Sequence, residues 1–309
     1  MFEFALKNNL LLAFGEKINN KKDIPQPFRN IYNNKMDFKN RALNIIQRLL
    51  MNCQEHDLMI MTIKSIFPYP YIDTNIDFVV VRPVDIQKII KILDKMDYKR
   101  QYSLADIREP NKKMYYHRKK LNLFPQLHLH EEISWNGVNY LENKNVWDRH
   151  KLFEIKHYSI PVPSPEDEIL IMAAHTMFEN KYITMGDLFY FYTLSFESVD
   201  WDYIFRSAQL KSWEKALDIF LFTAYKLLFL LGYPIELDMK IKHTFYISDE
   251  RFPYVLPLSQ TLNATYDKFV ADFDDFRVGV SLRQLFSYFI VDPFWMYYKA
   301  YQQTKKEIA

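Results

Sequence analysis

The chain has 309 residues, of which 49% are hydrophobic and 25% charged, so disorder is not the default and one or two domains with a buried core are possible. A net charge of +2 is too small to indicate nucleic acid as the partner, and the single cysteine, Cys53, excludes an intramolecular disulfide and any metal site built from several cysteines. The 5 glycines form neither G-x-x-x-x-G-K nor G-x-G-x-x-G, which excludes a glycine-rich phosphate loop.

The N-terminal region has no cationic segment ahead of a long apolar run. Its apolar stretch at residues 10–14 is too short for a signal-peptide core or a membrane span. We therefore expect a cytoplasmic protein without membrane attachment.

In chain order, helices alternate with short strands in the first half of the sequence. The patterns predict helices at 3–18 and 36–55 with a polar connector between them, strands at 58–64 and 75–82, and a helix at 84–96. Strands near 113–119, 125–134 and 153–159 follow. The sequence therefore predicts an α+β domain over residues 1–163.

From residue 164 onward, nearly every pattern is helical. Apolar spacing predicts helices at 166–180, 185–194, 200–209, 212–232 and 281–304. Ser164 is a candidate N-cap, and the proline and acids that follow it favour the start of a helix. We therefore expect a second, helical domain over residues 164–309.

Asp77 is the most informative polar residue, because it lies within a strand that is otherwise apolar enough to be buried. A buried carboxylate needs a cation, a hydrogen-bond donor or a function. Strand alternation places Asn75 on the same face, about 6.6 Å away along the strand. Two carboxylates so placed would hold Mg²⁺ against a triphosphate, but Asn75 has the oxygen without the charge. The simpler interpretation is that Asp77 caps or pairs at a strand end.

A second polar row, His128, His130 and Glu132, shares one face of the predicted strand at 125–134. Imidazoles and a carboxylate are a plausible ligand set for a transition metal. Side chains two residues apart on a strand converge on one ion less readily than histidines spaced i, i+4 on a helix. A structural or solvent-facing row, or the lining of a nucleotide cleft, is therefore the favoured interpretation.

Two further features have competing interpretations. Lys112-Lys113 and His117-Arg118-Lys119-Lys120 form a basic cluster on a predicted hairpin. A solvated strand edge explains this cluster more simply than RNA binding, because lysines protect exposed edges, but the cluster is also the best candidate for a phosphate-facing patch. His175 lies in the middle of a predicted helix, where we expect a buried histidine bonded to Asp187 rather than a catalytic base.

Short motifs along the chain together resemble one known family. They are Lys64-Ser65, a Tyr-Pro loop, the run from Asn75 to Val80, the strand around His130, Trp147-Asp148-Arg149, Pro165-Glu166-Asp167, His175, Asp187 and Asp200-Trp201. Over roughly residues 36–232, their order and spacing are similar to the uncharacterised nucleotidyltransferase family of the polymerase-beta-like superfamily. The resemblance implies a nucleotidyltransferase-like mixed β-sheet with flanking helices, followed by a mainly helical C-terminal domain.

The resemblance also implies roles for single residues. Lys64 and Ser65 match the step that ends the family's first strand, and with His130 they are expected to bind the nucleotide. Asp77 matches the second acid of an Asp-x-Asp pair on the next strand, where the superfamily holds divalent metal ions. The expected cofactor is therefore Mg²⁺ or Mn²⁺, with a nucleoside triphosphate as substrate.

This sequence departs from the family pattern at two acids. Asn75 stands where the first acid of the pair is expected and His128 where a third acid would lie; with Asp77 they are the expected catalytic residues. Asp73 and Glu132 are acids on the matching faces, so Asp77, Asp73 and Glu132 form the expected metal set. The loss of two ligand charges predicts a weakened or repurposed site, because charge stabilisation is usually the largest catalytic contribution.

Two functions follow from the resemblance. The first is the transfer of a nucleoside monophosphate from a triphosphate to a hydroxyl group on a small molecule, a protein or an RNA. The second is a catalytically inactive member of the family that binds a nucleotide or a partner in the same cleft. Both require residues 58–82 and 125–134 to lie side by side in one sheet, with Asp77 and the histidines in a shared crevice.

Overall fold

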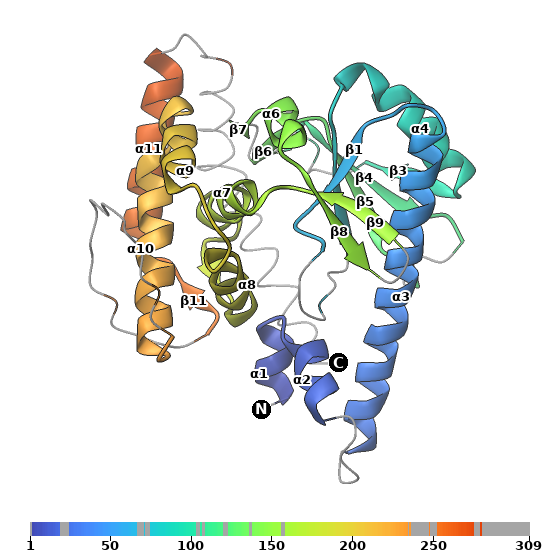
Figure 1. The fold of residues 1–309 in the computed structure, drawn as a ribbon, viewed down its shortest axis with the longest axis horizontal. Helices are drawn as coiled ribbons and strands as arrows, with labels where there is room; N and C mark the ends of the chain where they lie inside the picture. The colour runs from blue at the N-terminus through green and yellow to red at the C-terminus, as the bar shows by residue number, and fades with distance from the viewer. Residues whose placement is uncertain are drawn as a thin grey trace.

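The fold is described from a computed structural model, which covers residues 2–18, 25–66, 71, 75–102, 106, 109–119, 123–135, 138–155, 158–233, 235, 247, 252–274 and 279. Within these residues, a mixed β-sheet with flanking helices is joined to a group of helices (Figure 1). The expected α+β fold class is therefore confirmed.

The central sheet has the strand order β1-β2-β5-β4-β3. The strands are β1 (Ile60–Ile63), β2 (Asn75–Val80), β3 (Tyr98–Gln101), β4 (Lys112–His117) and β5 (Gln126–His130). β2 and β5 are parallel, whereas the other neighbouring pairs are antiparallel. Asp77 lies directly opposite His128 in the β2–β5 register, which confirms that the two segments pair in one sheet.

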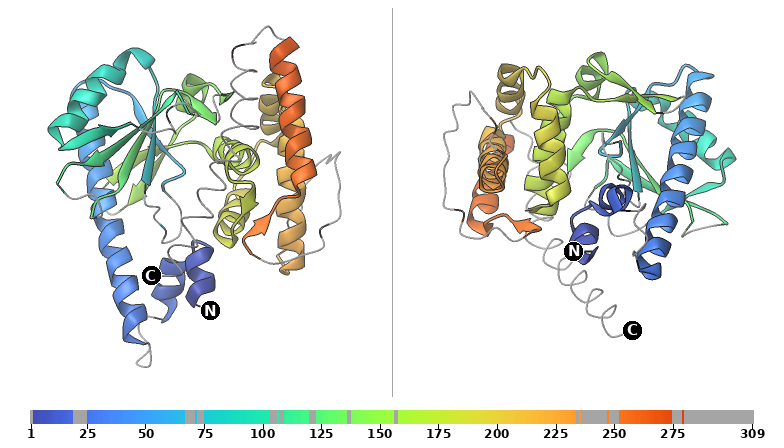
Figure 2. Two further views of the ribbon diagram at one scale, coloured as in Figure 1. Left: turned by 180° about the vertical axis from the view of Figure 1, so that it is seen from behind. Right: turned by 60° about the horizontal axis from the view of Figure 1, so that its bottom comes forward.

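The two faces of the sheet belong to different hydrophobic cores. On one face, Ile76, Phe78 and Val80 share a core with α3 (Gln26–Gln54) and α4 (Ile86–Lys95), which cover that face (Figure 2). α4 follows a short 3₁₀ helix, η1 (Pro83–Asp85). On the other face, Val79 of β2 shares a core with the helical part of the chain. The period-two alternation expected for β2 is thus confirmed, and it turns Asn75 and Asp77 toward the helical part.

The helical part starts at α7 (Pro165–His175), where the Ser164 hydroxyl accepts a hydrogen bond from the Asp167 amide. This N-cap is the one that the sequence predicts. A single π-helical turn, η2 (Thr176–Asn180), continues α7, and β10 (Tyr182–Ile183) then pairs with β11 (Tyr254–Val255). The other helices of this part are α8 (Met185–Ser195), α9 (Trp201–Leu210), α10 (Glu214–Leu230) and α11 (Leu258–Asp274).

Between the sheet and α7, Asn143 joins three segments of backbone. Its Oδ1 accepts a hydrogen bond from the Ile133 amide at 3.0 Å, and its Nδ2 donates to the carbonyl oxygens of Val80 at 2.9 Å and Glu131 at 2.8 Å. Asn143 is the first residue of α6 (Asn143–Asp148). The flanking elements are the hairpin of β6 (Ile133–Trp135) and β7 (Val138–Leu141), and that of β8 (Lys151–Ile155) and β9 (Tyr158–Val162).

The N-terminal segment contacts both halves of the molecule. The amides of Met185 and Gly186, at the start of α8, donate hydrogen bonds to Asn8 Oδ1 at 3.1 Å and to the Asn8 carbonyl at 3.0 Å. Farther along the segment, Phe14 packs edge-on against Phe28 of α3, with 6.0 Å between the ring centroids. The segment therefore lies between the start of α8 and the long helix beside the sheet (Figure 1).

Several predicted boundaries differ from the structure. The predicted helix at 3–18 is two helices, α1 (Phe2–Lys7) and α2 (Leu11–Ile18), and the helix predicted at 36–55 begins ten residues earlier, at Gln26. Phe28 and Tyr32, four residues apart, supply the apolar face of that earlier part. The strands predicted at 125–134 and 153–159 are each divided between two strands. The helix predicted at 281–304 lies outside the described residues.

The expected division after residue 163 falls between β9 and α7. Independent folding of the two parts stays a prediction. Within the described part of the chain, no helix combines the length and the apolar character needed to cross a membrane.

Candidate functional site

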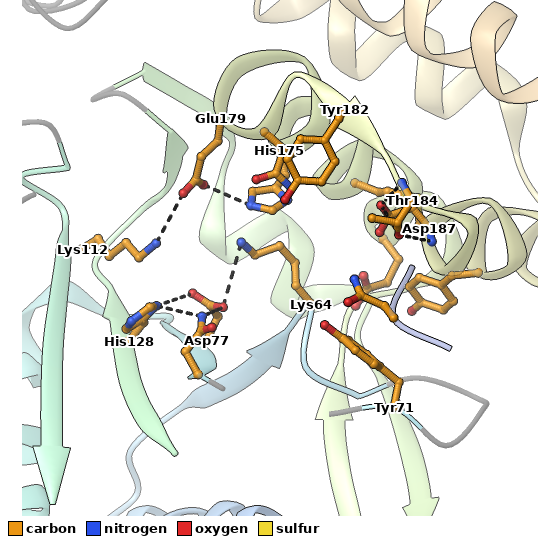
Figure 3. Close-up of a pocket in the computed structure, with 16 residues that line it drawn as sticks. Lys64, Tyr71, Asp77, Lys112, His128, His175, Glu179, Tyr182, Thr184 and Asp187 are labelled. Atoms are coloured by element: carbon orange, nitrogen blue, oxygen red, sulfur yellow. Dashed lines mark hydrogen bonds and ion pairs between the residues drawn. The ribbon is translucent and has the colours of Figure 1, made fainter. Parts of the chain in front are cut away.

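A pocket of about 360 Å³ opens between the sheet and the helical part (Figure 3). The sheet side of its lining consists of Lys64, Asn75, Asp77, Lys112 and His128. The helical side includes Glu168, His175, Glu179, Asn180, Tyr182 and Asp187. Residues far apart in the sequence thus meet in one cavity. Of the predicted site residues, Lys64, Asn75, Asp77 and His128 line it, whereas Ser65, His130 and Glu132 do not.

A turn after β1 directs Lys64 into this pocket. Lys64 has a left-handed backbone with φ of 51°, a conformation that costs a non-glycine residue about 1 kcal/mol and is often found at functional sites. The Ser65 hydroxyl fixes the turn, because it donates to the Ile63 carbonyl at 2.9 Å and accepts from the Asp77 amide at 2.9 Å. Ser65 therefore ties β1 to β2, and it is not part of the pocket lining.

Asp77 is 3% exposed, and both of its carboxylate oxygens are already engaged by side chains. Oδ2 accepts a hydrogen bond from Asn75 Nδ2 at 2.9 Å and lies 4.0 Å from the Lys64 ammonium. Oδ1 lies 2.7 Å from His130 Nε2 and 3.2 Å from His128 Nδ1. Burial raises the pKa of Asp77, but Lys64 and the two histidines outweigh it and hold this pKa well below its usual range.

The two histidines are neutral at pH 7 rather than cationic. Burial lowers the pKa of His128, and it lowers that of His130 to about 4 despite the nearby Asp77 carboxylate. The short contact from His130 Nε2 to Asp77 therefore places the single imidazole hydrogen on that nitrogen. His128 Nδ1 can donate to Asp77 or accept from Asn75 Nδ2, which lies 3.0 Å away.

The two expected metal ligands that the structure describes, Asp77 and Glu132, do not meet at one site. A carboxylate offers only acceptors, so Asn75 turns its amide nitrogen, and not its oxygen, toward Asp77. β5 ends at His130, and Glu132 instead accepts a hydrogen bond from Asn111 Nδ2 at 2.7 Å, outside the pocket lining. Asp73 lies outside the described residues. Among the described residues, no group of three or more His, Cys, Asp or Glu side chains is arranged to hold a metal ion.

On the helical side, Glu179 is the centre of a second charged network. Its Oε1 lies 3.9 Å from the Lys112 ammonium of β4, and its Oε2 lies 3.1 Å from His175 Nε2. Burial raises the pKa of Glu179, but Lys112 and His175 together hold it well below its usual range. The Lys112–Glu179 pair therefore joins the two walls of the pocket (Figure 3).

The predicted bond between His175 and Asp187 is wrong. His175 pairs with Glu179, four residues later, and Asn180 Nδ2 lies 3.3 Å from its other ring nitrogen. Asp187 accepts hydrogen bonds from the Thr184 amide at 2.8 Å and from its hydroxyl at 2.7 Å, and so forms the capping box of α8.

Glu168 is a buried acid of the helical wall that the sequence-based reasoning did not identify. It is 4% exposed, in the first turn of α7. Burial, followed by the charge of Asp167, raises the pKa of Glu168 to about 8, so this carboxyl group is neutral at pH 7. The pocket thus contains ionised Asp77 and Glu179 together with a protonated glutamic acid.

The chain belongs to a nucleotidyltransferase family: the model of the uncharacterised nucleotidyltransferase family matches residues 73–229, just over half of the sequence. The matched region runs from the residues before β2 to the end of α10 and contains both walls of the pocket except Lys64, Tyr71 and Asn9. A comparison with the curated proteins gave no match.

Proposed function

We propose that this protein binds a nucleoside triphosphate in the pocket between the sheet and the helical part. Membership of the nucleotidyltransferase family supports a nucleotide ligand in general. The observation that carries the proposal is the approach of two lysine ammonium groups, Lys64 and Lys112, to one cavity from the sheet side. Ammonium groups are common ligands of phosphates.

The size and the aromatic lining of the pocket agree with this proposal. Its volume of about 360 Å³ lies within the range of roughly 300–1,000 Å³ that is typical of small-molecule sites. Tyr71, Tyr182 and Tyr190 line it. Aromatic rings stack on nucleobases with little sequence preference, so these tyrosines would accept any of the four bases.

Nucleotidyl transfer to an acceptor hydroxyl is the second candidate function, and the ionised Asp77 favours it. A carboxylate in the pocket could accept the proton of an attacking hydroxyl group. However, Asn75, His128 and His130 already contact both Asp77 oxygens, and the described residues hold no cluster that fits the divalent metals such a transfer is expected to use. Nucleotide binding without transfer is therefore the function that this geometry supports best.

Isothermal titration of the full chain with ATP, GTP, CTP and UTP tests the proposal, in buffer with Mg²⁺ and in buffer with EDTA. We expect at least one triphosphate to bind. The Lys112→Met variant should weaken binding by about tenfold, because it removes a charged partner worth roughly 1.5 kcal/mol or more. The exposed Lys99 of β3 provides the matched control, Lys99→Met, which should bind as the natural chain does.

Two outcomes would count against this assignment. If none of the four triphosphates produces heat or raises the melting temperature at millimolar concentration in either buffer, the pocket is not a nucleotide site. If the chain releases pyrophosphate from a triphosphate with any acceptor tested, and Asp77→Asn abolishes that release, the transfer function replaces the binding function.

A further inference from the structure

Lys64 lies among three carboxyl groups that come from three different elements. They are Asp77 of β2, Glu168 of α7 and Glu179 of the π-helical turn, and all line the same pocket as Lys64. The Lys64 ammonium is 4.0 Å from Asp77 Oδ2. Burial is the largest influence on the pKa of each of these carboxyls, and the charge of Lys64 opposes it in all three. The Lys64 ammonium therefore acts on all three carboxyls through its charge and is paired at short distance with Asp77.

The position of this ammonium group is fixed by the fold. The left-handed turn at Lys64, held by Ser65, directs the side chain inward, and the side chain is only 14% exposed. Its nitrogen lies 5.2 Å from the centre of the Trp135 ring, close enough for a cation–π contact, and Trp135 is completely buried. Lys64 thus has neither the exposure nor the freedom of an ordinary surface lysine (Figure 3).

The charges around Lys64 balance without a further cation. At pH 7, Asp77 and Glu179 are ionised and Glu168 is neutral, as the directions and causes of their pKa shifts indicate. The two negative charges face two ammonium groups, Lys64 at Asp77 and Lys112 at Glu179. A divalent cation entering this cluster would therefore meet two resident cations, and each oxygen of Asp77 already has at least one side-chain hydrogen-bond partner.

We propose that the Lys64 ammonium takes the place of a divalent cation in this pocket, neutralising the acids and contacting the nucleotide phosphates itself, so that the triphosphate binds without a metal ion. The nucleotide part rests on the function proposed above. The other part, that Lys64 keeps a divalent cation out, rests only on the positions of Lys64 and the three carboxyl groups. It can be tested with no nucleotide present.

The first experiment is a titration with Mn²⁺ alone, followed by the paramagnetic signal of free Mn²⁺ and by the melting temperature. The natural chain should bind Mn²⁺ no better than the control Lys99→Met, with a Kd above about 1 mM, because the resident ammonium repels it. Lys64→Met removes the ammonium paired with Asp77 and its charge from the three carboxyls. This variant should therefore bind Mn²⁺ at least about tenfold more tightly and melt at a higher temperature when Mn²⁺ is present. Lys64→Arg keeps the charge and should remain insensitive to Mn²⁺.

The second experiment compares ATP binding in EDTA and in Mg²⁺. The Kd of the natural chain should change by less than about threefold, whereas Lys64→Met should lose about tenfold or more in EDTA through the missing charged contact. Lys64→Arg should retain part of the affinity, since it retains a cation.

Each result decides the matter. Three outcomes would each overturn the role of Lys64. The first is tight Mn²⁺ binding by the natural chain, and the second is a loss of ATP affinity of tenfold or more when the natural chain is moved from Mg²⁺ to EDTA. The third is a folded Lys64→Met variant that gains no Mn²⁺ affinity. If Lys64→Met does not fold, the Mn²⁺ titration of the natural chain and of Lys64→Arg still gives the answer. If ATP binds in neither buffer, the proposed nucleotide function fails, while the Mn²⁺ titrations still test the replacement of the cation.

Discussion

Replacing Glu168 with Gln should remove the pH dependence of stability that Glu168 itself contributes between about pH 4.5 and pH 8. Glu168 is buried at the first turn of α7, and its pKa rises from the ordinary 4.5 to about 8, chiefly through burial. A carboxyl with a raised pKa in the folded state contributes stability fully below its unfolded pKa. That contribution is lost as the pH rises from about 4.5 to about 8, because the unfolded chain ionises more easily than the folded one.

The size of the effect follows from the shift. A difference of roughly 3.5 pKa units corresponds to about 5 kcal/mol over the whole titration, at about 1.4 kcal/mol per unit. Between pH 6 and pH 9 the same linkage relation gives a loss of about 3 kcal/mol in the free energy of unfolding. Gln has the shape of a protonated Glu and does not ionise, so Glu168→Gln should lack this part of the slope.

Urea denaturation at pH 6, 7, 8 and 9 measures the difference directly. Other titrating groups are the same in both proteins, so the difference in slope between the natural chain and the variant isolates Glu168. The control is Glu197→Gln, because the Glu197 side chain is 47% exposed and pairs with Lys151 at the surface. If the natural chain and Glu168→Gln lose stability in parallel from pH 6 to pH 9, Glu168 is not a neutral buried acid.

Two other predictions concern the framework of the pocket. Asn143→Ala should lower the free energy of unfolding by about 3 kcal/mol, since it removes three hydrogen bonds to backbone groups, two of them buried, at about 1 kcal/mol each. Asn52→Ala, which loses one exposed hydrogen bond, is the control, and an equally small effect of both variants in thermal or urea unfolding would contradict this. Ile46 of α3 is fully buried, so Ile46→Ala should lower the free energy of unfolding by about 2–5 kcal/mol in the same measurement. Met51, which is 51% exposed, is the control, and Met51→Ala should cost less than about 0.5 kcal/mol. Similar losses for the two variants would refute the packing of α3 on the sheet.

The sheet side of the site was predictable because strand geometry has a period of two. Once 75–80 and 125–130 are recognised as neighbouring strands, alternation alone puts Asn75, Asp77 and His128 on one face. His130 follows from the same rule. The sequence shows that a buried Asp77 carboxylate needs hydrogen-bond donors, but it does not show which side chains donate to it.

The helical side was not predictable in the same way. Glu168 and Glu179 are ordinary-looking acids in a helical pattern, and only the tertiary packing of α7 against the sheet brings them to Lys64. The i, i+4 spacing of His175 and Glu179 was a usable signal, because such residues are neighbours on a helix. The π-helical turn that carries Glu179 has no sequence pattern of its own.

α11 was missed for a specific physical reason. Its buried positions include Thr261, Thr265, Lys268 and Asp272, so the stripe that faces the protein is largely polar. Lys268 and Asp272 pair at 2.5 Å, and Thr265 bonds back to the Thr261 carbonyl at 2.7 Å. A search for apolar residues at helical spacing does not detect a helix whose inner face is satisfied by hydrogen bonds and an ion pair.

The bonds from Asn8 to the start of α8 have a mechanical consequence. The backbone already joins the sheet to the helical half once, where β9 leads into α7. Asn8 adds a second attachment, and its segment reaches α3 through the Phe14–Phe28 contact. Opening the two halves apart would have to break these contacts as well as bend the β9–α7 connection, so they restrain any widening of the pocket between Lys64 and Glu179.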